Sequence, residues 1–136
     1  MIKPYKISVP KSTLNNIYKK VRAYPWKMMQ NVNGWEYGTN YNFLKKISQY
    51  WVSKYNWKKF ENKINSFKNY KTNVDGINLH FIKEKSKNPK SRPLLLLHGW
   101  PGSVIEFFDI IPRLAHPEKF GGKIEDGFDV IVPSLP

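Results

Sequence analysis

The segment RPLLLLHGWPGS, residues 92–103, sets the expected architecture of this chain. Four consecutive leucines, Leu94–Leu97, lead directly into a histidine, two glycines and a proline. An unbroken apolar run predicts a strand covered on both faces, as in a mostly parallel sheet with helices on either side. The carboxyl end of such a strand opens onto the crevice where α/β sheets bind ligands. We therefore expect the loop that follows Leu97 to be the place where chemistry occurs.

The loop from His98 to Gly102 combines residues that restrict the backbone and allow close approach. Gly99 and Gly102 carry no Cβ, while Pro101 fixes its own φ and biases Trp100 away from helical angles. The Trp100–Pro101 bond is of the type that can be cis. Such a loop can point a backbone N–H into the crevice just ahead of a helix N-terminus, which are the parts of an oxyanion hole. A tight turn without catalytic meaning accounts for the same spacing, so both interpretations stay open at this point.

The segments around this loop predict the rest of a strand–helix–strand unit. Ser103 and Glu106 have capping-box spacing, so a helix is expected to begin there and to carry Phe107, Ile110, Ile111 and Leu114 on its apolar face. The sequence GFDVIVPSLP, residues 127–136, predicts a second buried strand over 128–132. Upstream, alternating apolar residues on either side of Asp75-Gly76 predict an antiparallel hairpin.

Residues 1–68 have the periodicity of helices, and 69–136 that of the start of an α/β core, so we divide the chain there. A first helix is expected from Ser12 or Thr13, either of which could cap it, and it should end before Tyr24-Pro25-Trp26. An irregular loop over 31–40 and a second helix from about Asn40 follow, and then a shorter helical piece. The aromatic stripe of the second and third helices predicts core packing; its members are Leu44, Ile47, Trp51, Tyr55, Trp57, Phe60 and Ile64.

Composition narrows the function classes. The 136 residues contain no cysteine, which excludes disulfides and thiolate metal sites, and the formal charge is +13. The basic residues are mostly lysine and are spread along residues 1–92, so we expect a solvated lysine-rich surface, with binding of nucleic acid or an anionic membrane as the alternative. Neither a membrane-spanning apolar run nor a signal-peptide core is visible, which predicts a soluble cytoplasmic protein.

The motifs resemble those of one enzyme family. HGWPGS, followed by EF and then FDVIVPSLP, is similar to the HGxP motif and following strand of α/β-hydrolases, in detail those of microsomal-type epoxide hydrolases. WEYG, LKKISQYWVSKYNWKKFENKINSF and VDGINLHFI resemble that family's N-terminal segment. The likeness covers nearly the whole chain. The sequence departs from the family at Asn56, where an acidic residue is usual, at Lys58, where arginine is usual, and at Lys68, where proline is usual. We expect a protein without the membrane anchor that some relatives carry before this N-terminal segment.

The resemblance implies hydrolysis of an epoxide to a vicinal diol through an aspartyl ester, with no cofactor, no metal and no nucleic-acid partner. The N–H of Trp100 would be an oxyanion donor and its indole would line the substrate pocket, while His98, Gly99, Pro101 and Gly102 would support the loop. The aspartate nucleophile, the histidine base and the lid tyrosines lie downstream of residue 136 in the family. No Gly-x-Ser-x-Gly or Gly-x-Asp-x-Gly elbow occurs here.

We therefore expect an N-terminal fragment of an epoxide hydrolase with an incomplete α/β-hydrolase fold: a helical segment, a hairpin, and the first strand–helix–strand of the core. Alone it should be inactive and aggregation-prone, because the apolar faces of Leu94–Leu97 and Phe128–Val132 would lie open. Two alternatives remain at this point. The chain could be part of another α/β-hydrolase, such as a haloalkane dehalogenase, or a non-enzymatic basic binding module that heparin would retain.

Overall fold

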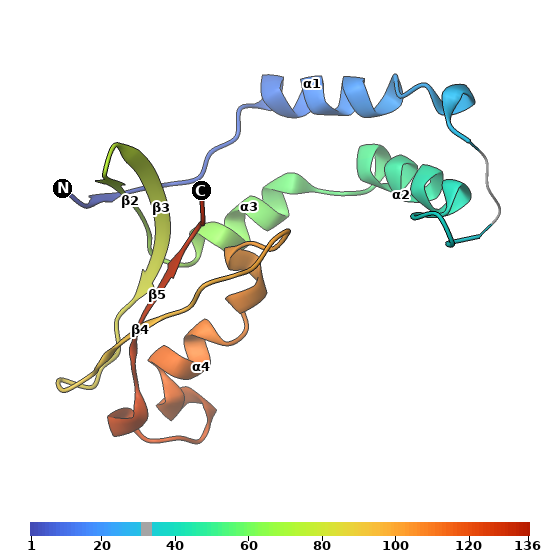
Figure 1. Ribbon diagram of the computed structural model, residues 1–136. Coiled ribbons are helices and arrows are strands. Elements are labelled where there is room, and N and C mark those ends of the chain that lie inside the picture. Colours follow the sequence, from blue (N-terminus) through green and yellow to red (C-terminus); the bar gives the residue numbers. More distant parts are fainter. Residues whose placement is uncertain (31–33) are drawn as a thin grey trace. The chain divides into compact units, whose positions relative to one another are not determined.

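A computed structural model describes residues 1–30 and 34–136, and these form two compact units (Figure 1). The sheet unit consists of Met1–Ile7 and Glu61–Pro136, and the helical unit of Ser8–Phe60. The division of the chain between residues 68 and 69 stays a prediction.

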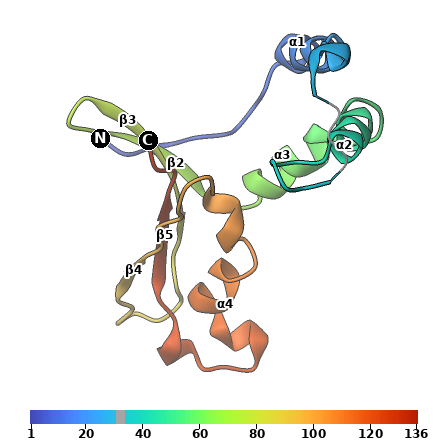
Figure 2. The same cartoon turned by 45° about the vertical axis from the view of Figure 1, so that its right-hand side comes forward.

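The sheet unit contains one five-stranded sheet of order β1-β2-β3-β5-β4 (Figures 1 and 2). Its strands are β1 (Lys3–Pro4), β2 (Asn69–Val74), β3 (Ile77–Glu84), β4 (Pro93–Leu95) and β5 (Asp129–Pro133). β4 and β5 are parallel, and the other neighbours are antiparallel. The predicted hairpin is confirmed: Asp75 and Gly76 have φ of 49° and 85°, the left-handed values that a tight two-residue turn requires.

The prediction that Leu94–Leu97 is covered on both faces is wrong for this sheet. β4 lies at the edge and pairs only with β5, and one further bond joins the N–H of Leu96 to the carbonyl of Ile131 at 3.0 Å. Leu94 is half-buried, whereas Leu95 and Leu97 are 58% and 56% exposed. The leucine run is apolar enough for a central strand, but an edge strand with one covered face buries only alternate side chains.

The covered face of the sheet carries the core of this unit. Helix α4 (Ile111–Ala115) packs against β3 and β5 (Figure 2), and the short 3₁₀ helix η2 (Val104–Phe107) packs against β5. The largest fully buried side chains there are Ile82, Ile111, Val130 and Val132. The expectation that Phe128–Val132 presents an open apolar face is wrong for one face, because Val130 and Val132 lie under these helices, whereas Phe128 and Ile131 are only half-buried.

The helix predicted after the loop begins as expected but does not continue as one element. Ser103 and Glu106 form the predicted capping box at the start of η2. The α-helix proper starts only at Ile111 and contains Pro112 in its first turn. A proline has no N–H, and its ring clashes with the carbonyl four residues earlier, so a continuous helix through this position is disfavoured.

The helical unit contains α1 (Lys11–Arg22), the 3₁₀ helix η1 (Trp26–Met28) and α2 (Tyr41–Ser53). Ser12 and Thr13 do not cap α1, whose N-cap is Pro10 without a side-chain hydrogen bond. α2 is capped by Asn40, whose side-chain oxygen accepts from the N–H of Phe43 at 3.0 Å. Part of the predicted irregular loop, residues 31–33, lies outside the described residues.

Helix α3 (Trp57–Asn65) begins in the helical unit and ends in the sheet unit, and residues just before and after it depart from the expected family pattern. The side-chain oxygen of Asn56 accepts from the N–H of Lys59 at 3.2 Å, so asparagine performs the capping that an acidic residue would. The N–H of Lys68 donates to Oε1 of Glu84 at 3.1 Å, a bond that proline could not make.

The aromatic stripe forms a closed core only at Ile64, which is 6% exposed, whereas its other members are half-buried or exposed. None of the described residues of the helical unit is fully buried, and Ile47, Tyr50 and Trp51 are about half exposed. They line an open hollow of about 520 Å³ together with Leu44, Ser48, Tyr55 and Trp57. Elsewhere in this unit the ring of Trp26 packs edge-on against Tyr41, with centroids 5.8 Å apart.

None of the helices in the described part of the chain is both long and apolar enough to cross a membrane.

Candidate functional site

In the loop that follows β4, the backbone N–H groups of His98, Gly99 and Trp100 have no hydrogen-bond partner among the residues that the structure describes. This loop lies at the carboxyl end of the parallel pair formed by β4 and β5, where α/β sheets place their ligands. Trp100 is 99% exposed, and among residues 1–30 and 34–136 its backbone N–H meets no hydrogen-bond acceptor. An unpaired N–H at this edge of a sheet can donate to a negatively charged oxygen.

Close contacts within the loop fix its shape. The N–H of Gly102 donates to the carbonyl of Gly99 at 2.7 Å, and the Trp100–Pro101 peptide bond is cis. A Cβ on Gly102 would collide with the carboxylate of Glu106 and lie 2.8 Å from the Gly99 oxygen, so this position requires glycine. The same carboxylate accepts from the N–H of Ser103 at 3.2 Å, which joins the loop to η2.

His98 connects the two carboxyl ends of the parallel strands. Its Nε2 accepts from the N–H of Leu135 at 3.1 Å, and its Nδ1 lies 3.1 Å from the Gly99 carbonyl. Both ring nitrogens therefore bind backbone, which is the geometry of a supporting residue, although its role in a reaction stays a prediction. Sequence reasoning did not find Leu135, because a contact across 37 residues leaves no local pattern.

Asp129 and the His116–Glu84 pair, also in the sheet unit, make contacts within the fold. Burial raises the pKa of Asp129, but hydrogen bonds from the Ser91 hydroxyl at 2.8 Å and the Ser86 N–H at 2.9 Å outweigh it and bring the pKa below its ordinary value. Nε2 of His116 lies 3.8 Å from Oε2 of Glu84. Over the described ranges, no group of three or more histidines and carboxylates is placed to hold a metal ion.

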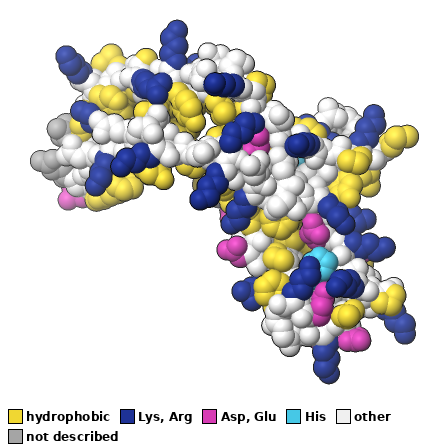
Figure 3. Space-filling view, turned by 180° about the vertical axis from the view of Figure 1, so that it is seen from behind, with side chains coloured by type: hydrophobic (Ala, Val, Ile, Leu, Met, Phe, Trp, Pro, Cys, Tyr) yellow, Lys and Arg dark blue, Asp and Glu magenta, His cyan; other side chains and the backbone are white. Residues whose placement is uncertain are grey.

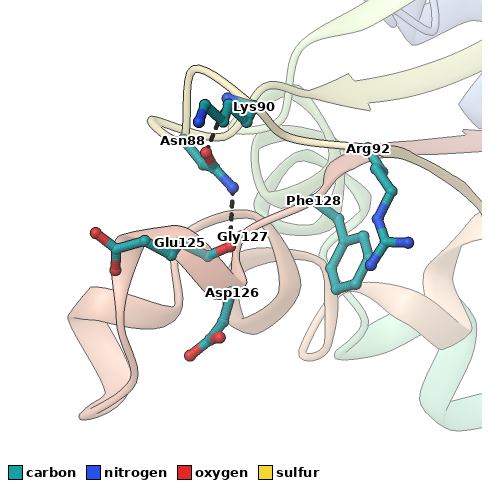
Figure 4. Close-up of a pocket in the computed structure, with 7 residues that line it drawn as sticks. All are labelled: Asn88, Lys90, Arg92, Glu125, Asp126, Gly127 and Phe128. Atoms are coloured by element: carbon teal, nitrogen blue, oxygen red, sulfur yellow. Dashed lines mark hydrogen bonds between the residues drawn. The ribbon is translucent and has the colours of Figure 1, made fainter.

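A second hollow lies at the opposite end of the parallel strands (Figure 4). It measures about 430 Å³ and is lined by Asn88, Lys90, Arg92, Glu125, Asp126, Gly127 and Phe128. Arg92 immediately precedes β4 and Phe128 precedes β5, so this hollow is at the amino ends of both strands. Figure 4 shows Arg92 beside the ring of Phe128, while the two carboxylates point away from it. The polar groups that line this hollow do not converge on one point, as those of a reactive site would.

The lysines form no single basic patch on the face drawn in Figure 3. Lysine and arginine side chains are dispersed over both units there, with apolar and uncharged surface between them. This dispersion favours the solvated surface that the composition predicts over a continuous phosphate-binding stripe.

The sheet and the site together define the class of protein. A hairpin joined to a strand–loop–helix–strand unit, with a glycine- and proline-containing loop at the carboxyl end of the first parallel strand, is the beginning of an α/β-hydrolase core. The family model described as "Epoxide hydrolase N terminus" matches residues 2–107. The chain therefore belongs to the epoxide hydrolase N-terminal family, as its motifs predict.

Relatives and solved structures agree with this assignment. The chain is 44% identical to a protein of Stigmatella aurantiaca over 99% of its own length and 31% of the relative's. It is 37% identical to epoxide hydrolase 1 of Oryctolagus cuniculus, covering 99% of the chain and 30% of that protein. The crystal structure of juvenile hormone epoxide hydrolase from Bombyx mori superposes with a TM-score of 0.84 at 32% identity, over 100% of this chain and 32% of that one. The chain thus spans about a third of the length of the curated relatives it matches.

Proposed function

We propose that this chain forms the N-terminal part of an epoxide hydrolase and that its loop supplies the N–H of Trp100 to the oxyanion of the reaction. The observation that carries the proposal is this unpaired N–H at the carboxyl end of β4. The loop is fixed by the Gly102–Gly99 bond and by His98, so the donor is oriented before any substrate binds. Preorganised donors of this kind stabilise developing charge without reorganising during the reaction.

The reaction implied by the family has two steps. A carboxylate oxygen of an aspartate attacks one epoxide carbon, the ring C–O bond breaks, and the freed oxygen takes a proton from a lid tyrosine. Water then attacks the carbonyl carbon of the resulting ester, and its proton passes to a histidine base. Collapse of the tetrahedral oxyanion breaks the C–O bond to the product, whose oxygen takes the remaining proton of the attacking water, so the diol leaves and the carboxylate is restored. The proton held by the histidine then returns to the tyrosine. The N–H of Trp100 would act in this second step, where the negative oxygen forms.

The described part of the chain supplies this donor, but neither Asp75 nor Asp129 is placed as a nucleophile. Asp75 lies in the hairpin turn, and Asp129 lies in β5, where its carboxylate accepts two hydrogen bonds. We therefore expect a protein made of residues 1–136 alone to form no diol. The exposed indole of Trp100 and the 56% exposed side chain of Leu97 favour an apolar small-molecule epoxide as the substrate.

The test uses the natural polypeptide that carries this chain, with styrene oxide as the substrate. Trp100→Pro removes the N–H, whereas Trp100→Phe keeps it and changes only the side chain. Loss of one oxyanion donor should slow ester hydrolysis roughly 100-fold or more. Mass spectrometry of the enzyme should then show the covalent ester accumulating in Trp100→Pro but not in Trp100→Phe.

Trp35→Phe is a matched control, because Trp35 is another exposed tryptophan that lies outside the loop. It should leave both steps unchanged. Equal rates of ester hydrolysis in Trp100→Pro and the unaltered enzyme would show that this N–H is not a donor in the reaction.

A further inference from the structure

Two histidines from different parts of the fold bind adjacent residues of the segment that follows β5. His80 lies on β3, and its Nδ1 is 2.8 Å from the hydroxyl of Ser134, while its carbonyl accepts from the Ser134 N–H at 2.9 Å. His98 accepts from the N–H of the next residue, Leu135, at 3.1 Å. Ser134 and Leu135 are thus held from both sides by three hydrogen bonds.

The orientation of the His80 ring is fixed by a buried amide. Asn69 is 5% exposed, and its Nδ2 donates to the carbonyls of Ile64 at 3.0 Å and Phe67 at 2.8 Å. These bonds use both amide hydrogens, so the Asn69 oxygen can only accept, and it lies 3.0 Å from Nε2 of His80. The hydrogen of His80 is therefore on Nε2.

The remaining nitrogen of His80 is an acceptor for Ser134. Burial and then the charge of Lys71 lower the pKa of His80, which favours the neutral ring at neutral pH. With its hydrogen on Nε2, the neutral ring receives the Ser134 O–H at Nδ1. The aromatic edge of Tyr5, with ring centroids 5.9 Å apart, packs on the same histidine.

His98 requires the opposite tautomer. Because Leu135 donates to Nε2, that nitrogen carries no hydrogen, and Nδ1 holds the hydrogen that points to the Gly99 carbonyl. The same carbonyl accepts from Gly102 at 2.7 Å. The N–H of Leu135 thus determines the tautomer of His98. The His98 ring in turn contacts Gly99, the residue that precedes Trp100.

We propose that His80 and Ser134 are positioning residues for the Trp100 N–H, acting through Leu135 and His98. The inference rests on the proposed function only for the use to which that N–H is put; the coupling itself is a property of the sheet unit. Without the Ser134 hydroxyl, the segment after β5 keeps one bond to β3 instead of two. The N–H of Leu135 then becomes less well placed for His98, and the loop loses a fixed orientation.

The first measurement is ¹⁵N NMR of the histidine rings in the natural polypeptide that carries this chain, with signals assigned by variants. We expect the Nε2–H tautomer for His80 and the Nδ1–H tautomer for His98. In Ser134→Ala, the ring nitrogens of His98 should shift toward a mixture of tautomers, and the amide signal of Trp100 should move. Ser134→Thr keeps the hydroxyl and should restore the original signals.

Ser91→Ala is the matched control, since the Ser91 hydroxyl bonds to Asp129 at the other end of β5. It should leave His98 and Trp100 unchanged. In the styrene oxide assay, Ser134→Ala should slow ester hydrolysis roughly tenfold, less than the loss of the donor itself, because a displaced group loses only part of its effect.

The two proposals fail in different ways. Unchanged His98 and Trp100 signals in Ser134→Ala, or the same tautomer in both histidines, would overturn the positioning role even if Trp100→Pro blocks turnover. If the signals move as expected while Trp100→Pro hydrolyses the ester normally, the coupling stands and the catalytic use of the N–H is wrong.

Discussion

The sheet unit buries its apolar side chains, whereas the helical unit leaves them half exposed. Ile82, Ile111, Val130 and Val132 are completely buried between the sheet and its helices, but no described residue of Ser8–Phe60 reaches that state. Both regions have clear apolar periodicity in their sequences. Periodicity therefore identifies which face of an element is apolar, while burial requires a second layer to cover that face.

The sharpest way to test this comparison is to shorten one isoleucine in each unit. Ile82→Ala should lower the free energy of unfolding by about 3 kcal/mol, because it leaves a cavity under a packed face. Ile47→Ala, at a side chain 47% exposed, should cost about 1 kcal/mol or less. Urea unfolding of the two variants measures both values, and equal losses would show that the helical unit has a closed core after all.

A smaller effect is expected at Asp129 of β5, whose carboxylate accepts hydrogen bonds from Ser86 and Ser91. Asp129→Asn should lower the free energy of unfolding by about 2 kcal/mol at pH 7, because two hydrogen bonds to a charged acceptor are weakened. The pKa of Asp129 is lowered in the folded state, so its contribution is present above about pH 3.9 and is lost as the pH falls through the folded value. The difference between Asp129→Asn and the unaltered protein should therefore shrink in acid.

Asp75→Asn provides the control for that experiment, because Asp75 lies in the exposed hairpin turn, where asparagine is equally suited to positive φ. Thermal unfolding at several pH values would record both variants. A loss in Asp129→Asn that stays constant down to pH 2 would contradict the account of its hydrogen bonds.

The smallest expected loss of stability distinguishes the N-terminal cap of α2 from the N-terminus of α1. Asn40→Ala should destabilise α2 by about 1 kcal/mol, since Asn40 accepts from the N–H of Phe43. Ser12→Ala should change stability by less than about 0.5 kcal/mol, because Ser12 does not cap α1. Circular dichroism during urea titration can compare them, and a larger loss in Ser12→Ala would reverse the assignment of the caps.

Most elements could be predicted from the sequence because their signals are local. The Asp75-Gly76 turn, the start of α2 near Asn40 and the Ser103 capping box each depend on residues within a few positions of one another. The break between η2 and α4 was not predicted, although Pro112 was a visible signal for it. The burial of β4 could not be read from four leucines, because coverage depends on which strands and helices lie beside them.

By itself, the sequence determined the order of the three longer helices and of strands β2 to β5, the glycine- and proline-containing loop at the end of β4, and the epoxide hydrolase family to which the chain belongs. Only the tertiary structure decided that the Trp100 N–H is unpaired and that two histidines hold the segment after β5. The physical reason is the range of the interactions. Propensity and spacing act over a few residues, whereas the bonds from His98 to Leu135 and from His80 to Ser134 join residues 37 and 54 positions apart and exist only once the sheet has formed.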